Sequence, residues 1–447
     1  MTIPMQDFLT KYLQFHSVSL AEENEIPETA EFLRTQFTKL GATTSRILHT
    51  DRTNPAVYAV FPAQTADAPT ILFYNHYDVQ PAEPLALWQS DPFQLKMTDT
   101  HLYARGINDD KGELAARLAA LQRLQAQGSL PCTIKFLVEG AEEQGSPNLD
   151  YLLAQYADLL AADFCLWESG GRNEQGKFQI SLGVKGGVAF QLSVKTADFD
   201  LHSSLGAITE NPAWRLVQAL ATLKNAKDEI TIPHFLDVVK PLTATQKLLI
   251  QDAAFDYAAF AKNYGITRPA TVPADDIKAA LYNRPSMTIN GLSSGYEGPG
   301  IGKTILPHTA LAKLDLRLVP DQTPAETVRL VKEALTAGGY DDVMVSDFIG
   351  EPPFRTDPDD PRVQTALQLA RATYGDDEVQ VELNSPGSGP MKYFYDINHA
   401  PIISCGIGNA HSAPHGPNEN VVIADYLSFI DYLTQLVPQL AKTKTAN

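Results

Sequence analysis

The chain has 447 residues, of which 44% are apolar and 20% charged, and its formal net charge is −18. This length exceeds what a single hydrophobic core usually supports, so two domains are expected rather than one. The acidic balance argues against nucleic acid and anionic membranes as main partners, because both require a basic surface.

The composition and the first residues predict a cytoplasmic protein. No run of about 18 uncharged apolar residues is present that could cross a bilayer. Residues 1–18 carry Asp7 and Lys11 inside an apolar pattern and lack a small-residue cleavage site, which indicates a helix rather than a signal peptide. Three cysteines in apolar runs without paired spacing are expected to be reduced core residues: Cys132, Cys165 and Cys405.

Strand-like and helix-like segments alternate in the first part of the chain. This alternation is typical of a mostly parallel sheet covered by helices. The expected strands are 56–61, 70–79, 132–140 and 163–168. The expected helices are 113–128, which closes on Gly128 as a C-terminal stop, and 149–161.

The pattern changes after Gly186 and Gly187. The following elements are expected in the order strand, helix, strand, strand, helix, strand: 188–196, 212–224, 286–292, 310–319, 324–337 and 342–349. This order is typical of a small ferredoxin-like domain. An insertion with helix-like apolar spacing interrupts it at about 231–285, and residues 352–361 are interpreted as a linker back to the first domain. That domain then continues with a buried strand at 401–408 and a closing helix from about Ala424.

Titratable residues collect at five places at or just beyond the expected C-terminal strand ends, the edge at which sites form in open α/β sheets. The first place is His76 and Asp78 in "FYNHYDVQP". Side chains two apart on a strand share a face, and a carboxylate commonly orients a metal-bound histidine. A surface pair at a strand end would give the same pattern.

Two acidic motifs follow. Asp109 and Asp110 precede a helix in "ARGINDDKGE"; one aspartate could be an N-cap, but two are more than a cap needs. In "LVEGAEEQGS", Glu139, Glu142 and Glu143 follow an apolar strand. Adjacent carboxylates at a buried edge repel each other, which is costly unless a cation neutralises them. Of two such carboxylates, one can bind the metal while the other transfers protons. A solvated acidic loop is the alternative.

The last two places are Glu168, which ends "FCLWE", and the loop "NAHSAPHGPNEN" with His411, His415 and Glu419. Histidines and carboxylates together form a nitrogen and oxygen ligand set. Such a set suits zinc, manganese or cobalt rather than metals that prefer thiolates.

The motifs "HYDVQP", "ARGINDDKGE", "EGAEEQGS", a carboxylate at 168 and "HGPNE" occur in an order and at separations that resemble the co-catalytic zinc metallopeptidases and amidohydrolases. That family includes carnosine-type dipeptidases, carboxypeptidase G, aminoacylase, acetylornithine deacetylase and succinyl-diaminopimelate desuccinylase. The resemblance covers essentially the whole chain. It implies a zinc-peptidase-like three-layer α/β/α catalytic domain (1–185 and 351–447) and an inserted ferredoxin-like α+β lid and dimerisation domain (186–350).

The resemblance also implies a role for each motif residue. Two divalent metal ions, zinc or else manganese or cobalt, would have His76, Asp109, Glu143, Glu168 and His415 as ligands. His76 and Glu168 would bind one ion, Glu143 and His415 the other, and Asp109 would bridge both. Asp78 would orient His76, and Glu142 would be the general base. Two ions about 3.5 to 4 Å apart can share a hydroxide and polarise the scissile carbonyl.

Four further residues would contact the substrate, and two of them, His202 and Arg317, belong to the second domain. His202 in "DLHSSLG" would reach into the site of the partner subunit of a homodimer and stabilise the oxyanion. Arg317 would hold the substrate carboxylate, although a salt bridge on a strand face is an alternative. Ser388 and Gly389 in "SPGSGP" would form a substrate-binding loop.

Several positions depart from the family pattern. Asn75 and Ser204 stand where glycines are usual, and neither change removes a ligand. Glu168 stands where dipeptidases usually have aspartate, whereas carboxypeptidases and deacylases have glutamate. His411 competes with His415 for the last ligand position, and the spacing to Glu419 favours His415.

The resulting functional prediction is a metallopeptidase that cleaves dipeptides or short peptides with a free C-terminal carboxylate. The alternative is an N-acyl-amino-acid amidohydrolase, which Glu168 favours. A catalytically inactive binding homologue is disfavoured, because every ligand position and Glu142 are filled.

Overall fold

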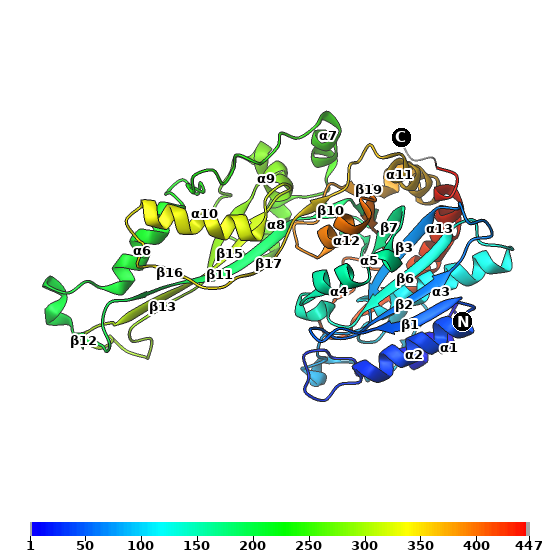
Figure 1. Cartoon of the computed structure of the whole chain (residues 1–447), viewed down its shortest axis with the longest axis horizontal. Coiled ribbons are helices and arrows are strands. Elements are labelled where there is room, and N and C mark those ends of the chain that lie inside the picture. The colour runs from blue at the N-terminus through cyan, green and yellow to red at the C-terminus, as the bar shows by residue number, and fades with distance from the viewer. Residues whose placement is uncertain (1, 444–447) are drawn as a thin grey trace.

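A nine-stranded mixed sheet organises the larger of two units in the computed structural model, which describes residues 2–443 (Figure 1). Its strands, in spatial order, are β1 (Thr44–Leu48), β2 (Ala56–Phe61), β6 (Thr133–Glu139), β3 (Thr70–His76), β7 (Phe164–Trp167), β20 (Ile402–Ser404), β9 (Phe178–Ser181) and β19 (Val379–Glu382), with β8 (Gly171–Arg172) paired to β9. The central strands β6, β3, β7 and β20 are parallel, whereas β1, β2 and β6 pair antiparallel. The expected parallel arrangement therefore holds for the centre of the sheet but not for its first edge.

Helices cover both faces of this sheet. One face shares the largest apolar core with α1 (Gln6–Tyr12), α2 (Ile26–Lys39), α3 (Lys111–Ala126), α11 (Pro361–Tyr374) and α13 (Ile423–Leu440). The other face packs with α4 (Leu149–Gln155), α5 (Ala157–Leu160) and α12 (Met391–Asn398). Alternate residues of β2 divide accordingly, since Val57 and Ala59 join the first core while Ala56 and Tyr58 join the second. The predicted three-layer α/β/α architecture is confirmed.

The central strand β3 accounts for the continuous apolar run that precedes His76 in the sequence. After Thr70 every residue of β3 is buried, as is typical of a parallel strand covered on both faces. The strand ends at His76, three residues before the expected end at 79. His76 therefore stands at the last position of the ladder, where its side chain can leave the sheet.

The smaller unit contains a separate antiparallel sheet with two helices on one face (Figure 1). Its elements are β11 (Gly186–Lys195), α6 (Pro212–Leu223), β13 (Ser286–Ser294), β15 (Thr309–Leu318), α10 (Pro324–Ala337), β16 (Met344–Val345) and β17 (Ile349–Glu351). The spatial order β13-β15-β11-β16, with β17 also on β11, is the order of a ferredoxin-like sheet. The last strand, expected as one segment, is divided into two short ones. The predicted lid fold is confirmed.

The insertion in this unit is helical, as predicted, and reaches the larger unit. Its helices are α7 (Ala244–Asp252), α8 (Tyr257–Asn263) and α9 (Ile277–Asn283). Ile250 of α7 and Tyr282 of α9 share a small apolar core with Leu383, which directly follows β19. The insertion therefore connects the lid to the edge of the catalytic sheet.

Short elements complete the described chain. They are the ladder β10 (Gly183–Val184) with β18 (Phe354–Arg355), the ladder β12 (Leu201–His202) with β14 (Ile305–Leu306), the sheet of β4 (Lys96–Met97), β5 (His101–Tyr103) and β21 (Asn420–Val422), and 3₁₀ turns at Leu85–Leu87, Glu142–Gln144, Ser203–Ala207, Ala274–Asp276 and Asp376–Glu378. Asp360, in the expected linker, caps α11 by accepting a hydrogen bond from the Arg362 amide.

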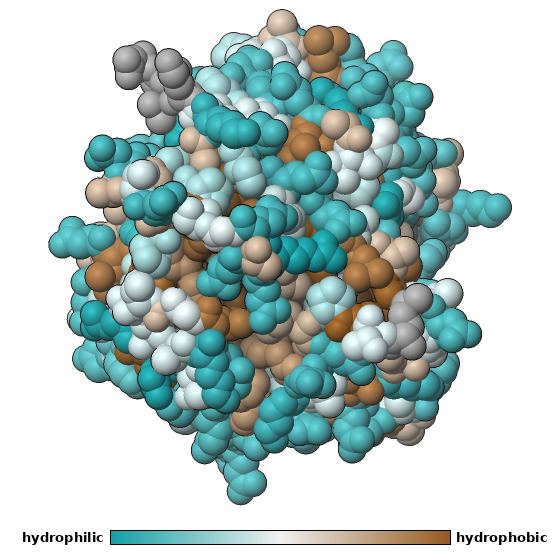
Figure 2. Space-filling model, turned by 90° about the vertical axis from the view of Figure 1, so that its right-hand side faces the viewer, coloured by the Kyte–Doolittle hydropathy of each residue, from teal (hydrophilic) through white to brown (hydrophobic). Residues whose placement is uncertain are grey.

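The surface and the interior agree with the composition. Figure 2 views the catalytic unit from the end away from the lid, and this face is mostly hydrophilic with scattered apolar patches. Among residues 2–443, no helix has both the length and the apolar character to cross a membrane. The three cysteines are buried and free, as predicted.

Glu382, at the end of β19, makes stability depend on pH. Burial raises the pKa of its carboxyl group to about 7, although Tyr282 and Gln179 donate hydrogen bonds to it. Because this folded-state pKa exceeds the unfolded value of about 4.3, the carboxyl group binds its proton more tightly in the folded protein. Its favourable contribution to the free energy of unfolding is therefore fully present below about pH 4.3 and is lost as the pH rises through 7. We expect Glu382→Gln to raise the melting temperature relative to wild type above about pH 7, reflecting at most about 4 kcal/mol, and to lose that advantage near pH 4.

Thermal unfolding of both proteins across this pH range measures the effect. Glu378→Gln provides the matched control, because Glu378 is exposed just before the same strand. An advantage of Glu382→Gln that stays constant with pH would contradict the assignment to this carboxyl group.

Candidate metal centre and active site

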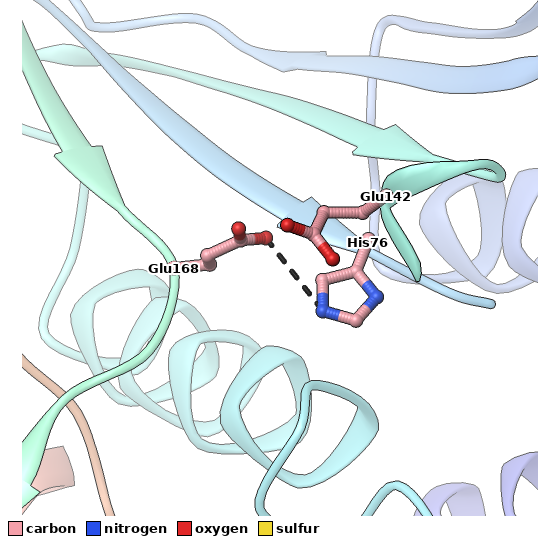
Figure 3. A group of neighbouring side chains, drawn as sticks. All are labelled: His76, Glu142 and Glu168. Carbon is pink, nitrogen blue, oxygen red and sulfur yellow. Dashed lines mark ion pairs between the residues drawn. The ribbon is translucent and has the colours of Figure 1, made fainter. Parts of the chain in front are cut away.

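Three parallel strands bring the first group of site residues to one edge of the sheet. His76 ends β3, Glu168 follows β7, and Glu142 lies in the 3₁₀ turn after β6. Figure 3 shows the three side chains directed toward one another, and His76 Nε2 lies 3.7 Å from Glu168 Oε2. Ligand atoms of all three lie within 4.8 Å of one another. His76 and Glu168 are buried, so their polar atoms face this cluster rather than solvent.

Asp109 connects this group to a second one. Its Oδ1 lies 3.0 Å from His76 Nε2 and its Oδ2 lies 3.1 Å from His415 Nε2. His415 Nε2 also lies 3.1 Å from Glu143 Oε2. Each oxygen of this carboxylate thus contacts a different histidine, the arrangement that a bridging ligand requires. All five residues expected to bind metal are adjacent.

Other candidates from the same motifs lie outside this arrangement. Glu139 accepts a hydrogen bond of 2.6 Å from the Tyr74 hydroxyl and belongs to neither ligand group. Asp110 faces Asn75 and the backbone amide of His76. His411 is exposed, and its backbone amide donates to the Asn409 side chain. His415, rather than His411, contacts the acidic cluster.

Asp78 does more than the sequence indicated. The nearest partner of His76 Nδ1 is the backbone carbonyl of Asp78 at 2.9 Å, while the Asp78 carboxylate lies at 3.5 Å. That carboxylate accepts the backbone amides of Glu142 and Glu143, each at 3.1 Å, and the hydroxyl of Ser19 at 2.7 Å. Asp78 therefore holds both the imidazole and the turn that carries the two glutamates.

Glu419 supports Asp109 in a similar way and was not assigned a role from the sequence. Its Oε1 accepts the amides of Asn108 and Asp109 at 2.8 and 3.0 Å. Its Oε2 accepts the Gly106 amide at 2.8 Å and pairs with Arg105 at 2.7 Å. The mark of Glu419 in the sequence is its fixed spacing from His415, and this spacing does not indicate a contact with Asp109.

Burial and mutual repulsion perturb the titration of the cluster. Burial raises the pKa of Glu142 to about 8 and that of Glu168 well above its usual value. Hydrogen bonds to Asp109 and Glu143 raise the pKa of His415 to about 10. Burial alone would lower the pKa of His76, yet the surrounding carboxylates raise it well above its usual value. These groups would therefore bind protons unless metal ions replaced those protons.

The residues fit such ions. Glu168 Oε2 is buried without a hydrogen-bond partner among the described residues, so its lone pairs are free for a ligand. The cluster offers two imidazoles and several carboxylates and no thiolate, which suits hard or borderline divalent cations.

A cleft of about 600 Å³ extends from this cluster to the lid. Its lining includes Glu142 from the catalytic unit and Arg317 from β15, together with Ser388 and Gly389. Arg317 donates to Ser388 Oγ at 3.2 Å and to Asp315 Oδ1 at 3.1 Å. The strand-face salt bridge considered for Arg317 is thus present, and the residue also faces the cleft.

His202 lies elsewhere. It is exposed, contacts Ser204 Oγ at 2.9 Å, and belongs to β12 at the end of the lid farthest from the catalytic unit (Figure 1). A single chain therefore does not bring His202 to its own metal cluster.

Comparison with known proteins agrees with this geometry. The sequence profile of Peptidase family M20/M25/M40 matches residues 72–439. The crystal structure of an M20 family metallo-carboxypeptidase, Sso-CP2 from Sulfolobus solfataricus, is 34% identical, covers 99% of this chain and 100% of that chain, and superposes with a TM-score of 0.87. Beta-Ala-His dipeptidase of Rattus norvegicus is 28% identical over 80% of this chain and 74% of its own length. The structure of the di-peptidase Dug1p from Saccharomyces cerevisiae, at 23% identity, has the same fold with a TM-score of 0.77 and covers 98% of this chain and 95% of that chain. Because the family profile matches most of its length, this chain belongs to peptidase family M20/M25/M40 and is a metallopeptidase.

Proposed function

We propose that the enzyme hydrolyses dipeptides or short peptides that end in a free carboxylate. One observation carries the proposal: a single cleft joins the Glu142 end of the metal cluster to the Arg317 guanidinium. A short peptide bound there has its C-terminal carboxylate at Arg317 and Ser388 and its scissile bond at the cluster. The dipeptidase and carboxypeptidase activities of the similar rat and Sulfolobus proteins support this choice.

The chain's own residues divide the catalytic work. His76 with Glu168 and His415 with Glu143 would hold two divalent cations, zinc or else manganese or cobalt, and Asp109, which contacts both histidines, would be shared by the two ions. When bound, two such ions lower the pKa of a shared water and polarise the scissile carbonyl. Glu142 accepts the proton of the attacking water at its carboxylate and delivers it to the leaving nitrogen. Asp78 holds Glu142 and His76 in position through its contacts with the Glu142 amide and the His76 imidazole.

A substrate panel tests the proposal. The purified enzyme, loaded in turn with zinc, manganese or cobalt, is expected to release amino acids from dipeptides with a free α-amine. Absence of turnover on every dipeptide with every metal would overturn the proposal.

The same panel separates the second candidate, an N-acyl-amino-acid amidohydrolase, which the glutamate at 168 favours. Each dipeptide is compared with its N-acetylated amino acid analogue at equal concentration. Faster hydrolysis of the acetylated series would replace the peptidase proposal with the deacylase.

We also propose that residues 1–185 and 351–447 form the catalytic domain and 186–350 the lid, with the chain crossing between them at β10 and β18.

We further propose that the lid forms the interface of a homodimer. Its edge strand β13 exposes Ile289 and Leu292 by 47% and 58%, and α6 exposes Trp214 and Val217 by 67% and 43%. An edge strand with unpaired backbone groups can pair with a second copy.

In this dimer, His202 of the partner subunit stabilises the oxyanion in the site of the first. His202→Ala is expected to lower kcat/KM by about a hundredfold, the usual effect of removing one such donor. Mixing this variant with Glu142→Ala should restore about a quarter of wild-type activity, because half of the dimers are mixed and each has one intact site.

The two variants are refolded or coexpressed together and assayed beside each one alone. Recovery of activity only in the mixture is the signature of action across the dimer. If mixing restores nothing, His202 does not act in the partner's site.

A further inference from the structure

A buried arginine lies between the strands that carry two of the metal ligands. The ladder between β3 and β7 pairs Phe73 with Leu166 and goes no further. Beyond that point Arg117 of α3, which is fully buried, donates Nη1 to the carbonyls of Tyr74 and Leu166 at 2.7 and 3.2 Å. Its Nη2 donates to the Trp167 carbonyl at 2.6 Å. One guanidinium thus replaces the missing ladder bonds between the two strands.

The two strand ends are the positions that matter for metal binding. Tyr74 lies two residues before His76, and Trp167 directly precedes Glu168. Since a guanidinium is planar and its donors have a fixed geometry, it sets the separation of the carbonyls that it binds. Arg117 therefore sets the distance between the backbones of the two strands at the point from which the His76 and Glu168 side chains extend.

Asn75 connects this arginine to the remaining ligand loop. Its Oδ1 accepts from Arg117 Nη1 at 3.0 Å, and its Nδ2 donates to Asp110 Oδ2 at 2.6 Å. The same Asp110 oxygen accepts the backbone amide of His76 at 3.2 Å. Asn75 has no exposed surface. An asparagine at the position where glycine is usual thus makes a specific bridge between α3, β3 and the loop that carries Asp109.

The positive charge of Arg117 has a carboxylate partner within this layer. Arg117 also forms an ion pair with Glu113 one turn earlier on α3, and both side chains are fully buried. A lysine in place of Arg117 would keep the charge but could not bind three carbonyls, an amide oxygen and a carboxylate in one plane. The planar shape of the guanidinium, and not only its charge, therefore allows Arg117 to connect these groups.

We propose that Arg117 and Asn75 are positioning residues of the metal centre, which fix the spacing of His76, Glu168 and Asp109 for two divalent cations. The inference rests on the proposed metal-dependent function, and it assigns no contact between these two residues and the substrate. Loosening this layer is expected to weaken metal binding before it affects the fold.

Cobalt binding tests the proposal without an activity assay. Wild type, Asn75→Ala and Arg117→Lys are titrated with cobalt(II) against a chelator, and the visible absorption of the loaded proteins is recorded. Both variants should bind cobalt about 10- to 100-fold more weakly, the range for residues that support ligands, and their absorption bands should change. Melting temperatures of the metal-free proteins measure stability separately.

Arg362→Lys is the matched control. Arg362 donates to the carbonyl of Asp163, just before the opposite end of β7, so it also anchors this strand by a guanidinium. The Arg362→Lys variant should at most lower the melting temperature, and it should leave cobalt affinity and the absorption spectrum unchanged.

The outcomes are distinct. Unchanged cobalt affinity and spectrum in Asn75→Ala, with only a lower melting temperature, would show that the layer is merely structural and would overturn the proposal. If Arg117→Lys does not fold, Asn75→Ala decides, because it removes no buried charge. If wild type binds no cobalt, this proposal fails; if wild type binds cobalt but cleaves no peptide, only the proposed function fails.

Discussion

Replacing Glu142 with alanine is expected to lower kcat by about 10²- to 10⁴-fold while two metal ions per chain stay bound, because positioned proton transfer contributes this much to rate. Glu142 lies in the cleft beside the ligand cluster, and its backbone amide is held by Asp78 at 3.1 Å. The alanine variant keeps that backbone contact and removes only the carboxylate. Initial rates on the best dipeptide and metal analysis of the purified protein are the two measurements.

The control for this variant is Gln144→Ala. Gln144 belongs to the same 3₁₀ turn, is exposed, and donates to the Ser19 carbonyl at 2.7 Å. Its replacement perturbs the turn without removing an acid. If Glu142→Ala retained most of its kcat, or lost metal together with activity, Glu142 would be a ligand or a bystander rather than the base.

Replacing His415 with alanine is expected to remove one metal ion and with it almost all activity. His415 Nε2 is placed between Asp109 and Glu143, each at 3.1 Å, so its loss leaves two carboxylates without a nitrogen ligand between them. Affinity for the second ion should fall by more than about a hundredfold, beyond the effect of losing a supporting residue. Metal content after dialysis and the rate at saturating zinc provide the test.

His411→Ala is the matched control in the same loop. His411 is exposed and, among the described residues, makes neither of the contacts with Asp109 and Glu143 that His415 makes, so metal content and rate should stay within about twofold of wild type. The reverse result, with His411 essential and His415 dispensable, would show that His411 rather than His415 binds the metal.

Long elements with a continuous pattern could be predicted from the sequence. The apolar run of β3 and the boundaries of α6 and α10 follow from local residues, and the structure has them within a few positions. The strands β9 and β19 were not predicted. They are four residues each, and their parallel pairing joins Phe178 to Val379 across 200 intervening residues. Nothing local in such short segments distinguishes a strand from a loop, because the partner determines it.

The same distinction applies to the site. Residues that carry the chemistry stand in compact motifs at strand ends, so these motifs could be singled out from the sequence. The resemblance to a known family then indicated His76, Asp109 and Glu143 within them. The residues that hold them could not be predicted. Glu419 and Arg117 act through backbone amides and carbonyls, which every residue has, so no residue type in the sequence marks the partner.

Asp109 is held by Glu419 and faced by His415, both more than 300 positions later in the chain. Strands β20 and β19 likewise enter the catalytic sheet only after the lid has been completed. During synthesis the N-terminal part of a chain folds first. A growing polypeptide therefore lacks both the carboxylate that holds Asp109 and the imidazole that faces it until residues 415–419 have left the ribosome. The order of the motifs along the chain makes the assembly of this cluster a late event in synthesis.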